Sequence, residues 1–132
     1  MNAIFEDMQD DQNEKNGSCI ADAASLDALL RSFTGRKPFC FLLKGENGSA
    51  VTVGWGPRLG SVQFGPSTGA PPYQMATAED AFDDDEAVEF LAGDTPTPIP
   101  RRFCMPIEKV KCVVLDFLRD GQKSPGVAWE EI

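Results

Sequence analysis

An Asn-Gly dipeptide between two β-prone runs is the feature that most constrains the fold of this 132-residue chain. Asn47 and Gly48 lie between residues 39–44 and residues 50–55, which are rich in aromatic, aliphatic and β-branched side chains. Asn-Gly favours the backbone dihedral angles of a tight hairpin turn, so these two segments are predicted to pair as antiparallel strands. The chain is therefore expected to contain an antiparallel sheet.

Three further short segments are typical of strands. They are residues 61–64, residues 73–77 and residues 87–93, and turn-forming Gly and Pro residues precede the first two. No alternation of strands with helices, which would indicate a parallel sheet, is visible along the chain. We therefore predict an α+β fold, with an antiparallel meander sheet of about five or six strands and two principal helices packed on it.

Two segments carry apolar residues at the spacing of a helix with one buried face. The first runs from Ser25, which suits the N-cap position, to a stop at Gly35. The second is residues 106–120, and Gly121 ends its pattern. The side chains expected to pack this second helix on the sheet are Val110, Val114 and Phe117.

The stretch PTPIPRRFCMPIEKV, residues 96–110, leads into the second helix. Its prolines indicate a loop that stops either neighbouring element from extending, and Pro106 suits the first helical position because no N–H is needed there. Arg101 and Arg102 stand just before the helix. They either bind an anion or pair with the acidic segment that precedes them, and internal pairing is the favoured interpretation.

The chain is strongly acidic, with 12 Lys plus Arg against 21 Asp plus Glu and a formal net charge of −9. Such a charge opposes binding to nucleic acid or to an anionic membrane and favours a basic protein partner, although it also suits a protein that is merely soluble. The first residues lack the features of a secretory signal, and no run approaches the roughly 20 apolar residues of a membrane span. We therefore expect a cytoplasmic protein.

The length of 132 residues is near the usual size of one domain. Residues 1–17 carry five acidic residues and one lysine without a clear periodicity. We expect a mobile acidic arm over residues 1–17, followed by a single α+β domain over residues 18–132.

Little in the sequence indicates catalysis. The chain has no histidine, which removes the commonest general base and most zinc sites. The glycines of residues 54–65 lie between β-prone runs and lack the Lys-Ser/Thr of a phosphate loop, so we assign them to hairpins. The four cysteines are scattered without a C-x-x-C pair, which suits reduced, buried thiols better than a disulfide framework or a metal site. We expect no enzyme activity, no cofactor and no bound metal.

Eight acidic residues and no basic residue occur from Glu79 to Asp94. A calcium loop needs oxygen donors at alternating positions and a central Gly, whereas the acids at 83–86 are consecutive and point in diverging directions. The segment is either a solvated charged loop or a docking surface for a basic partner. The candidate partner-binding residues in it are Asp80, Asp83, Asp84, Asp85, Glu86 and Glu89.

The tail contributes two further candidates. Residues 127–130 have the alternation of a half-buried strand. This pattern favours packing of Trp129 on the sheet over a role as an interface anchor. Trp129 and Glu130 are nevertheless retained as candidate partner-binding residues.

Several of these motifs together resemble a known family. They are a Gly-Trp-Gly element in the hairpin, a Pro-Pro-Tyr strand start, the string EFLAGDTPTPIPRRFCMPIEKV, a helix closing in FLRDGQKSPGV and a terminal Trp-Glu-Glu. The chain resembles the Imm1 family of immunity proteins, which belong to bacterial polymorphic toxin systems. The resemblance covers roughly residues 20–132 and is strongest from residue 86 onward.

The resemblance implies a stoichiometric protein inhibitor that binds and neutralises a cognate toxin domain and that performs no catalysis itself. It implies a toxin that often acts on nucleic acid, such as a deaminase or a nuclease, and the acidic balance of the chain suits a basic toxin. The alternative is a small-ligand-binding or regulatory module acting within a larger complex. A deep pocket with converging polar groups would favour that alternative.

Overall fold

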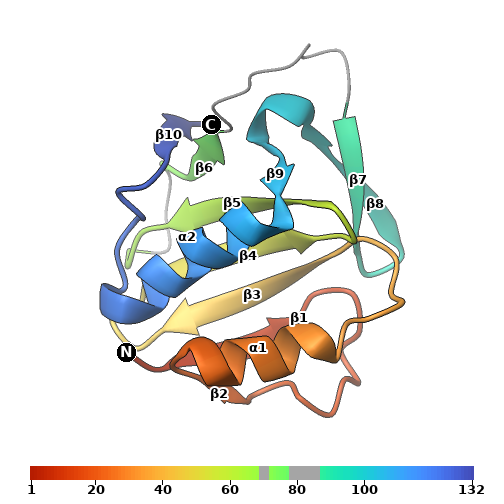
Figure 1. Cartoon of the computed structure of the whole chain (residues 1–132), viewed down its shortest axis with the longest axis horizontal. Coiled ribbons are helices and arrows are strands. Elements are labelled where there is room, and N and C mark those ends of the chain that lie inside the picture. The colour runs from red at the N-terminus through yellow and green to blue at the C-terminus, as the bar shows by residue number, and fades with distance from the viewer. Residues whose placement is uncertain (69–71, 78–86) are drawn as a thin grey trace.

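The structure of the chain, a computed structural model, describes residues 1–68, 72–77 and 87–132 (Figure 1). Within these residues ten strands form one sheet, and two α-helices and a short 3₁₀ helix complete the fold. The strands are β1 (Ala3–Asp7), β2 (Cys19–Ile20), β3 (Phe39–Gly45), β4 (Ala50–Trp55), β5 (Leu59–Gly65), β6 (Gln74–Thr77), β7 (Ala87–Ala92), β8 (Thr95–Pro100), β9 (Met105–Pro106) and β10 (Ala128–Glu131). The helices are α1 (Ala23–Arg31), η1 (Arg101–Phe103) and α2 (Ile107–Asp120).

The sheet is built around an antiparallel meander. β3, β4, β5 and β6 are neighbours in this order both along the chain and across the sheet. The hairpin between β3 and β4 turns at Asn47 and Gly48, and the φ of Gly48 is 88°, which glycine adopts without strain. The predicted α+β class and the predicted hairpin are confirmed.

The sheet has more strands than the predicted five or six. β1 and β2 extend it beyond β3, β10 pairs with β6 at the opposite end, and β7 runs parallel to β3 at the pair Phe39 and Leu91. β2 and β9 are two residues long, so they leave no periodic pattern in the sequence.

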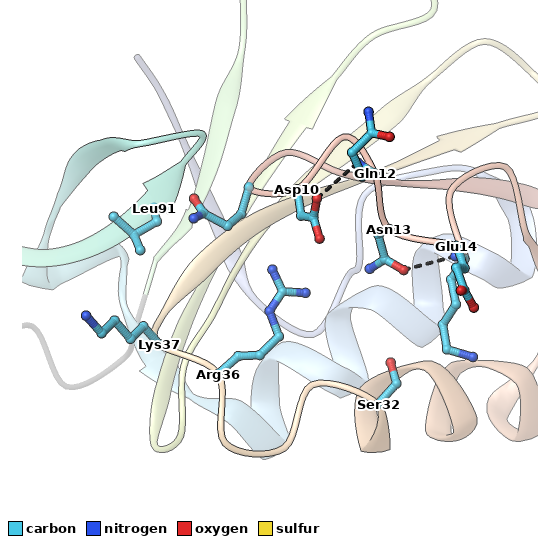
Figure 2. A pocket seen from close by; sticks show the side chains of 10 residues that line it. Asp10, Gln12, Asn13, Glu14, Ser32, Arg36, Lys37 and Leu91 are labelled. Carbon is cyan, nitrogen blue, oxygen red and sulfur yellow. Dashed lines mark hydrogen bonds between the residues drawn. The ribbon is translucent and has the colours of Figure 1, made fainter.

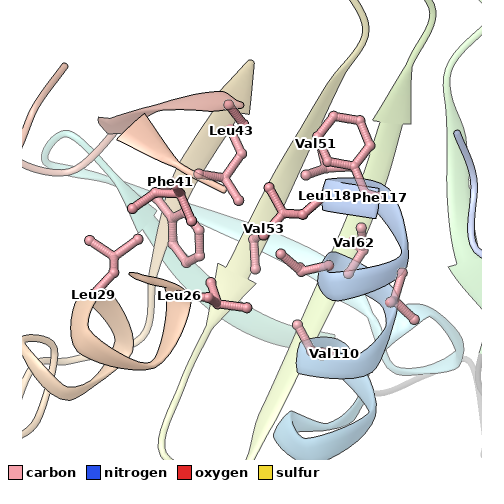
Figure 3. Close-up of a cluster of buried hydrophobic side chains, with 14 of the residues drawn as sticks. Leu26, Leu29, Phe41, Leu43, Val51, Val53, Val62, Val110, Phe117 and Leu118 are labelled. Atoms are coloured by element: carbon pink, nitrogen blue, oxygen red, sulfur yellow. The ribbon is translucent and has the colours of Figure 1, made fainter. Parts of the chain in front are cut away.

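Both α-helices lie side by side over one face of the sheet (Figure 1). Strand side chains alternate between the two faces, so every second residue of the meander points toward the helices. Figure 3 shows these side chains meeting α1 and α2 in one apolar layer. Its largest buried members include Phe5, Leu26, Phe41, Leu43, Val53, Phe117 and Leu118. The predicted packing of α2 through Val110, Val114 and Phe117 is confirmed.

Local caps define the ends of the helices. α1 begins earlier than predicted: Asp22 is the N-cap, and its carboxylate accepts from the N–H of Ser25 at 2.8 Å, while the Ser25 hydroxyl accepts from the N–H of Asp22 at 3.1 Å. Ser25 is therefore the third helical residue of a capping box and not the cap itself. α2 begins at Ile107 with Pro106 as its N-cap, and it ends, as predicted, at Gly121, whose φ is 74°.

The N-terminal segment belongs to the sheet, which corrects the expectation of a mobile arm over residues 1–17. β1 pairs with β3 along all five of its residues. Ala3 and Phe5 are fully buried, and the ring of Phe5 lies 5.7 Å from that of Phe41. The buried and exposed positions of β1 alternate, but a five-residue alternation among acidic residues is too short to distinguish a strand from a loose arm.

The proline-rich stretch before η1 is a strand and not the predicted loop. β8 pairs with β7 as an antiparallel hairpin, and Pro96, Pro98 and Pro100 alternate with residues that can donate. Since proline has no N–H, the donors to β7 come from the residues between the prolines, and the proline nitrogens face away from β7. An edge strand tolerates this arrangement because its outer side has no ladder to complete.

A second, smaller apolar cluster lies on the other face of the sheet. Cys40 alternates with Phe39 and Phe41 along β3, so its side chain points away from the helices. It packs with Phe90 of β7 and with Cys104, and all three are buried. The cluster attaches the β7–β8 hairpin to the sheet.

None of the described helices has both the length and the apolar character needed to span a membrane.

Candidate functional site

The predicted acidic site lies mostly beyond what the structure describes. Five of its residues fall outside the described residues, namely Asp80, Asp83, Asp84, Asp85 and Glu86. Glu89 is described, and its side chain is exposed in the middle of β7. Its neighbour Phe90 is fully buried, so Glu89 points outward from the strand that Phe90 anchors.

Trp129 lies on β10, where it is half-buried. Its ring meets that of Phe64 nearly edge-on, with 6.3 Å between the centroids, and its indole N–H donates to the carbonyl of Ser124 at 2.9 Å. This geometry agrees with the favoured interpretation, in which Trp129 packs on the sheet. A role for Trp129 in partner binding stays a prediction.

Glu130 forms an ion pair with Arg102 of η1, with 3.1 Å between Oε1 and Nη2. Both side chains are well exposed, at 46% and 37%. Arg102 thus pairs within the protein, as favoured from the sequence, and its partner among the described residues is in the tail. β10 pairs with β6, whereas β7 pairs with β3 and β8, so Glu130 and Glu89 lie on strands that are not paired with each other.

A buried carboxylate organises the loop that follows β1. The side chain of Asp7 is 0% exposed, and it accepts hydrogen bonds from the backbone N–H groups of Gln9 at 2.9 Å and Asp10 at 3.0 Å. The side-chain amide of Asn13 donates to the same carboxylate at 2.9 Å. Arg36, from the connection between α1 and β3, donates to it at 2.7 Å. Four donor residues from two segments therefore converge on one buried side chain.

The electrostatics of this cluster favour the charged form of Asp7. Burial by itself raises the pKa of a carboxyl group, but the hydrogen bonds from Arg36, Asn13 and two backbone N–H groups outweigh burial and hold the pKa of Asp7 below its usual value of 3.8. The Arg36 guanidinium also lies over the Phe39 ring, 3.6 Å from its centroid. Arg36 therefore joins the loop to the apolar core.

The same loop borders a hollow of about 820 Å³ (Figure 2). Figure 2 shows the Arg36 side chain rising into this hollow from the α1–β3 connection. The charged residues around it are Asp10, Glu14, Lys15, Arg36 and Lys37. Positively and negatively charged side chains both surround the hollow, and Arg36 is already paired with Asp7. The hollow is therefore a broad polar surface that favours neither anions nor cations.

A second recess, the α1–α2 groove, runs between the two helices. It consists of two adjoining hollows of about 280 and 390 Å³ that share Leu30, Thr34, Trp55 and Ile107. Trp55 is the last residue of β4, half-buried, and packs against the main core. From the sequence alone, Trp55 is predicted only to lie within a hairpin element. A tryptophan between two glycines at a strand end is the signal that indicates a partly open aromatic surface.

The sequence matches the family model of the immunity protein Imm1 over residues 17–131. The chain belongs to the Imm1 family of immunity proteins. The resemblance seen in the proline, helix and tryptophan motifs is thereby confirmed, and membership implies a protein that provides immunity against a toxin. No curated protein matches the chain.

The Imm1 match includes the meander, both helices of the groove and β10. β1 and most of the loop held by Asp7 precede it. This Imm1 protein therefore adds a buried strand and a polar loop to the part of the chain that the family model matches.

Two of the four cysteines of this Imm1 protein are buried. Burial raises the pKa of the Cys40 and Cys104 thiols to about 11, so both are protonated and poor nucleophiles at neutral pH. Cys19 and Cys112 are exposed, which corrects the expectation that all four are buried. Within residues 1–68, 72–77 and 87–132, no three Cys, Asp or Glu side chains cluster closely enough to hold a metal ion.

Proposed function

We propose that this Imm1 protein binds a cognate toxin domain stoichiometrically and neutralises it without catalysis, and that the toxin is a basic domain acting on nucleic acid, such as a deaminase or a nuclease. The observation that carries the proposal is family membership over residues 17–131 in a chain with a net charge of −9. A nucleic-acid-acting domain needs positive charge to hold its substrate. An acidic inhibitor is attracted to that same surface and can cover it.

The same charge supports the rest of the proposal. A net charge of −9 repels nucleic acid and anionic membranes, so the toxin itself is the expected partner. We place the encounter in the cytoplasm, where a toxin of this kind meets its substrate. No cofactor is needed, because inhibition requires only that the toxin stays bound to this protein.

We assign the approach of the toxin to the acidic segment, with Asp80, Asp83, Asp84, Asp85, Glu86 and Glu89 as its residues. The exposed position of Glu89 on β7 supports this assignment. Trp129 and Glu130 on β10 form a second, separate candidate surface, and the exposed Glu130 carboxylate is partly neutralised by Arg102.

The first experiment tests neutralisation. Toxin domains encoded next to this protein are expressed in a bacterial host with and without it, and growth is measured. Rescue of growth by this protein, together with a one-to-one complex on size-exclusion chromatography, supports the proposal. Failure to rescue any such toxin contradicts it.

The second experiment tests the acidic segment. Changing Asp83, Asp84 and Asp85 together to Lys is expected to slow association, because rim charges act mainly on the association rate. The expected loss of binding free energy is about 2–5 kcal/mol in total. The thermal stability should hardly change, since surface charges of this kind are close to neutral for folding. Association is measured at low and high salt with the rescued toxin.

A triple change of equal charge provides the control. Asp10, Asp11 and Glu14 are exposed on the loop held by Asp7, and their replacement by Lys alters the net charge by the same amount. If the two triple variants slow association equally, only the total charge matters. If the variant with Lys at positions 83–85 binds the toxin with unchanged, salt-independent affinity, these residues form a solvated loop and not a docking surface.

A small-ligand-binding or regulatory module is the second candidate function. The hollow of about 820 Å³, with Arg36, Asn13 and Lys37 around it, is the observation that favours it. It ranks second because most of the lining is exposed and Arg36 is already bound to Asp7. Saturable binding of a small anion with a rise in melting temperature, lost in Lys37→Ala, would favour this candidate.

A further inference from the structure

The α1–α2 groove combines an aromatic floor, aliphatic walls and a polar rim. Trp55 lies at the floor, and Leu30 and Ile107, both half-buried, lie on the walls contributed by α1 and α2. An ion pair between Asp27 and Lys111 spans the two helices at the rim. Tryptophan with apolar neighbours and a surrounding polar rim is the arrangement in which a few interface residues contribute most of the binding energy.

Charged residues of both signs line the groove: Arg31, Arg36 and Lys111 are basic, and Asp27 and Glu108 are acidic. Lys111 is paired with Asp27. Arg36 is paired with Asp7. Arg31 and Glu108 form no ion pair with any residue that the structure describes. A positive charge that is not neutralised beside an exposed apolar floor favours a partner that presents a carboxylate next to an apolar side chain.

We propose that this groove holds the toxin: a large apolar side chain of the toxin packs over Trp55, and Arg31 binds a carboxylate beside it. This inference rests on the proposed function and adds a location and a chemistry to it. The toxin is the occupant because the chain belongs to a family of immunity proteins.

The groove and the acidic surface then have separate tasks. Long-range attraction to acidic residues raises the association rate, whereas buried apolar and charge-paired contacts lengthen the lifetime of the complex. The Arg36 side chain lines both the groove and the hollow beside the Asp7-held loop, so the two recesses form one continuous surface.

Two variants test the groove without removing core contacts. Thr34 is exposed and lines both hollows, so Thr34→Phe obstructs the groove, and Arg31→Glu reverses the exposed charge at its rim. Their matched controls are Thr52→Phe, on the sheet face away from the helices, and Arg119→Glu, whose side chain is 65% exposed in the last turn of α2. Binding kinetics are measured with the toxin that this protein neutralises in growth assays.

Each groove variant is expected to raise the dissociation rate at least about tenfold. The association rate should change less than about threefold for Thr34→Phe, whereas Arg31→Glu also alters it because an exposed rim charge acts on the encounter. The controls should dissociate within about twofold of the wild-type rate, and melting temperatures within about 2 °C establish that the variants fold. Wild-type dissociation rates in both groove variants would overturn the inference and leave the proposed function intact. If the wild-type protein binds no toxin, the proposed function and the inference fall together.

Discussion

Replacement of Asp7 by Asn tests whether one buried carboxylate holds the N-terminal strand and its loop to the domain. The change keeps the shape of the side chain but removes its charge and turns one acceptor oxygen into a donor amide. Four donors meet the wild-type carboxylate, from Gln9, Asp10, Asn13 and Arg36. An Asn side chain cannot accept from all of them, so at least one donor loses its partner or faces another donor.

The expected loss follows from burial and charge. Breaking a buried ion pair costs about 3–5 kcal/mol when the remaining charge stays buried. The Arg36 side chain is 27% exposed and lies over Phe39, so water and the ring compensate part of that loss. The Asn carbonyl also retains one acceptor. We therefore expect Asp7→Asn to lower the free energy of unfolding by about 2–4 kcal/mol at pH 7, or about 8–16 °C in melting temperature for a domain of this size.

The dependence on pH identifies the charge as the cause. The folded pKa of Asp7 lies below its usual value of 3.8. Its charged form therefore contributes stability that is fully present above the unfolded pKa and is lost as the pH falls through the folded pKa. The difference between the wild-type protein and Asp7→Asn should be constant from pH 8 to pH 5 and should shrink below about pH 4.

Chemical denaturation monitored by circular dichroism at several pH values measures these differences. Asp10→Asn is the matched control, because the Asp10 side chain is exposed and accepts one hydrogen bond, from the N–H of Gln12; we expect a change within about 0.5 kcal/mol. An equally small loss for Asp7→Asn at pH 7, or a difference that grows as the pH falls, would refute the reasoning.

Two further predictions concern the core and the thiols. Phe117→Ala should cost about 3–5 kcal/mol, because the Phe117 ring is 1% exposed and packs on Phe64; a melting temperature close to that of the wild-type protein would contradict this. With iodoacetamide at pH 8, Cys19 and Cys112 should be alkylated within minutes, and mass spectrometry should find Cys40 and Cys104 at least about 100-fold slower, since a pKa of about 11 leaves little thiolate. Equal labelling of all four thiols in the folded protein would show that the second apolar cluster opens readily.

Local signals in the sequence predict those parts of the fold that are determined over short distances. The Asn47-Gly48 turn predicts the hairpin of β3 and β4, and helical spacing with Gly121 predicts α2 and its end. In each case the residues that decide the structure are neighbours in the chain, so propensity and periodicity are sufficient.

Long-range pairing accounts for what sequence reasoning missed. β1 is held by pairing with β3 and by the contact of Asp7 with Arg36, 29 residues away, and neither leaves a local pattern. The α1–α2 groove likewise exists because α1, β4 and α2 meet in space, although Trp55 is visible in the sequence. A recess of this kind is a property of packing between elements, so charged runs in the sequence indicate the acidic segment and not the groove.

β8 shows how a proline pattern can specify a strand. Prolines at every second position leave the N–H groups between them free to pair with β7, and Gly93, with a φ of 62°, precedes the strand in a tight turn. The outer side of β8 then presents prolines and no N–H donor, so pairing of another chain with this edge as an additional strand is disfavoured. Such an edge benefits an acidic inhibitor, because the inhibitor must bind its partner and must not bind other copies of its own chain. Recognition of the toxin at β8 by strand addition is thereby disfavoured, and side-chain contacts in a recess such as the α1–α2 groove are the alternative that the fold provides.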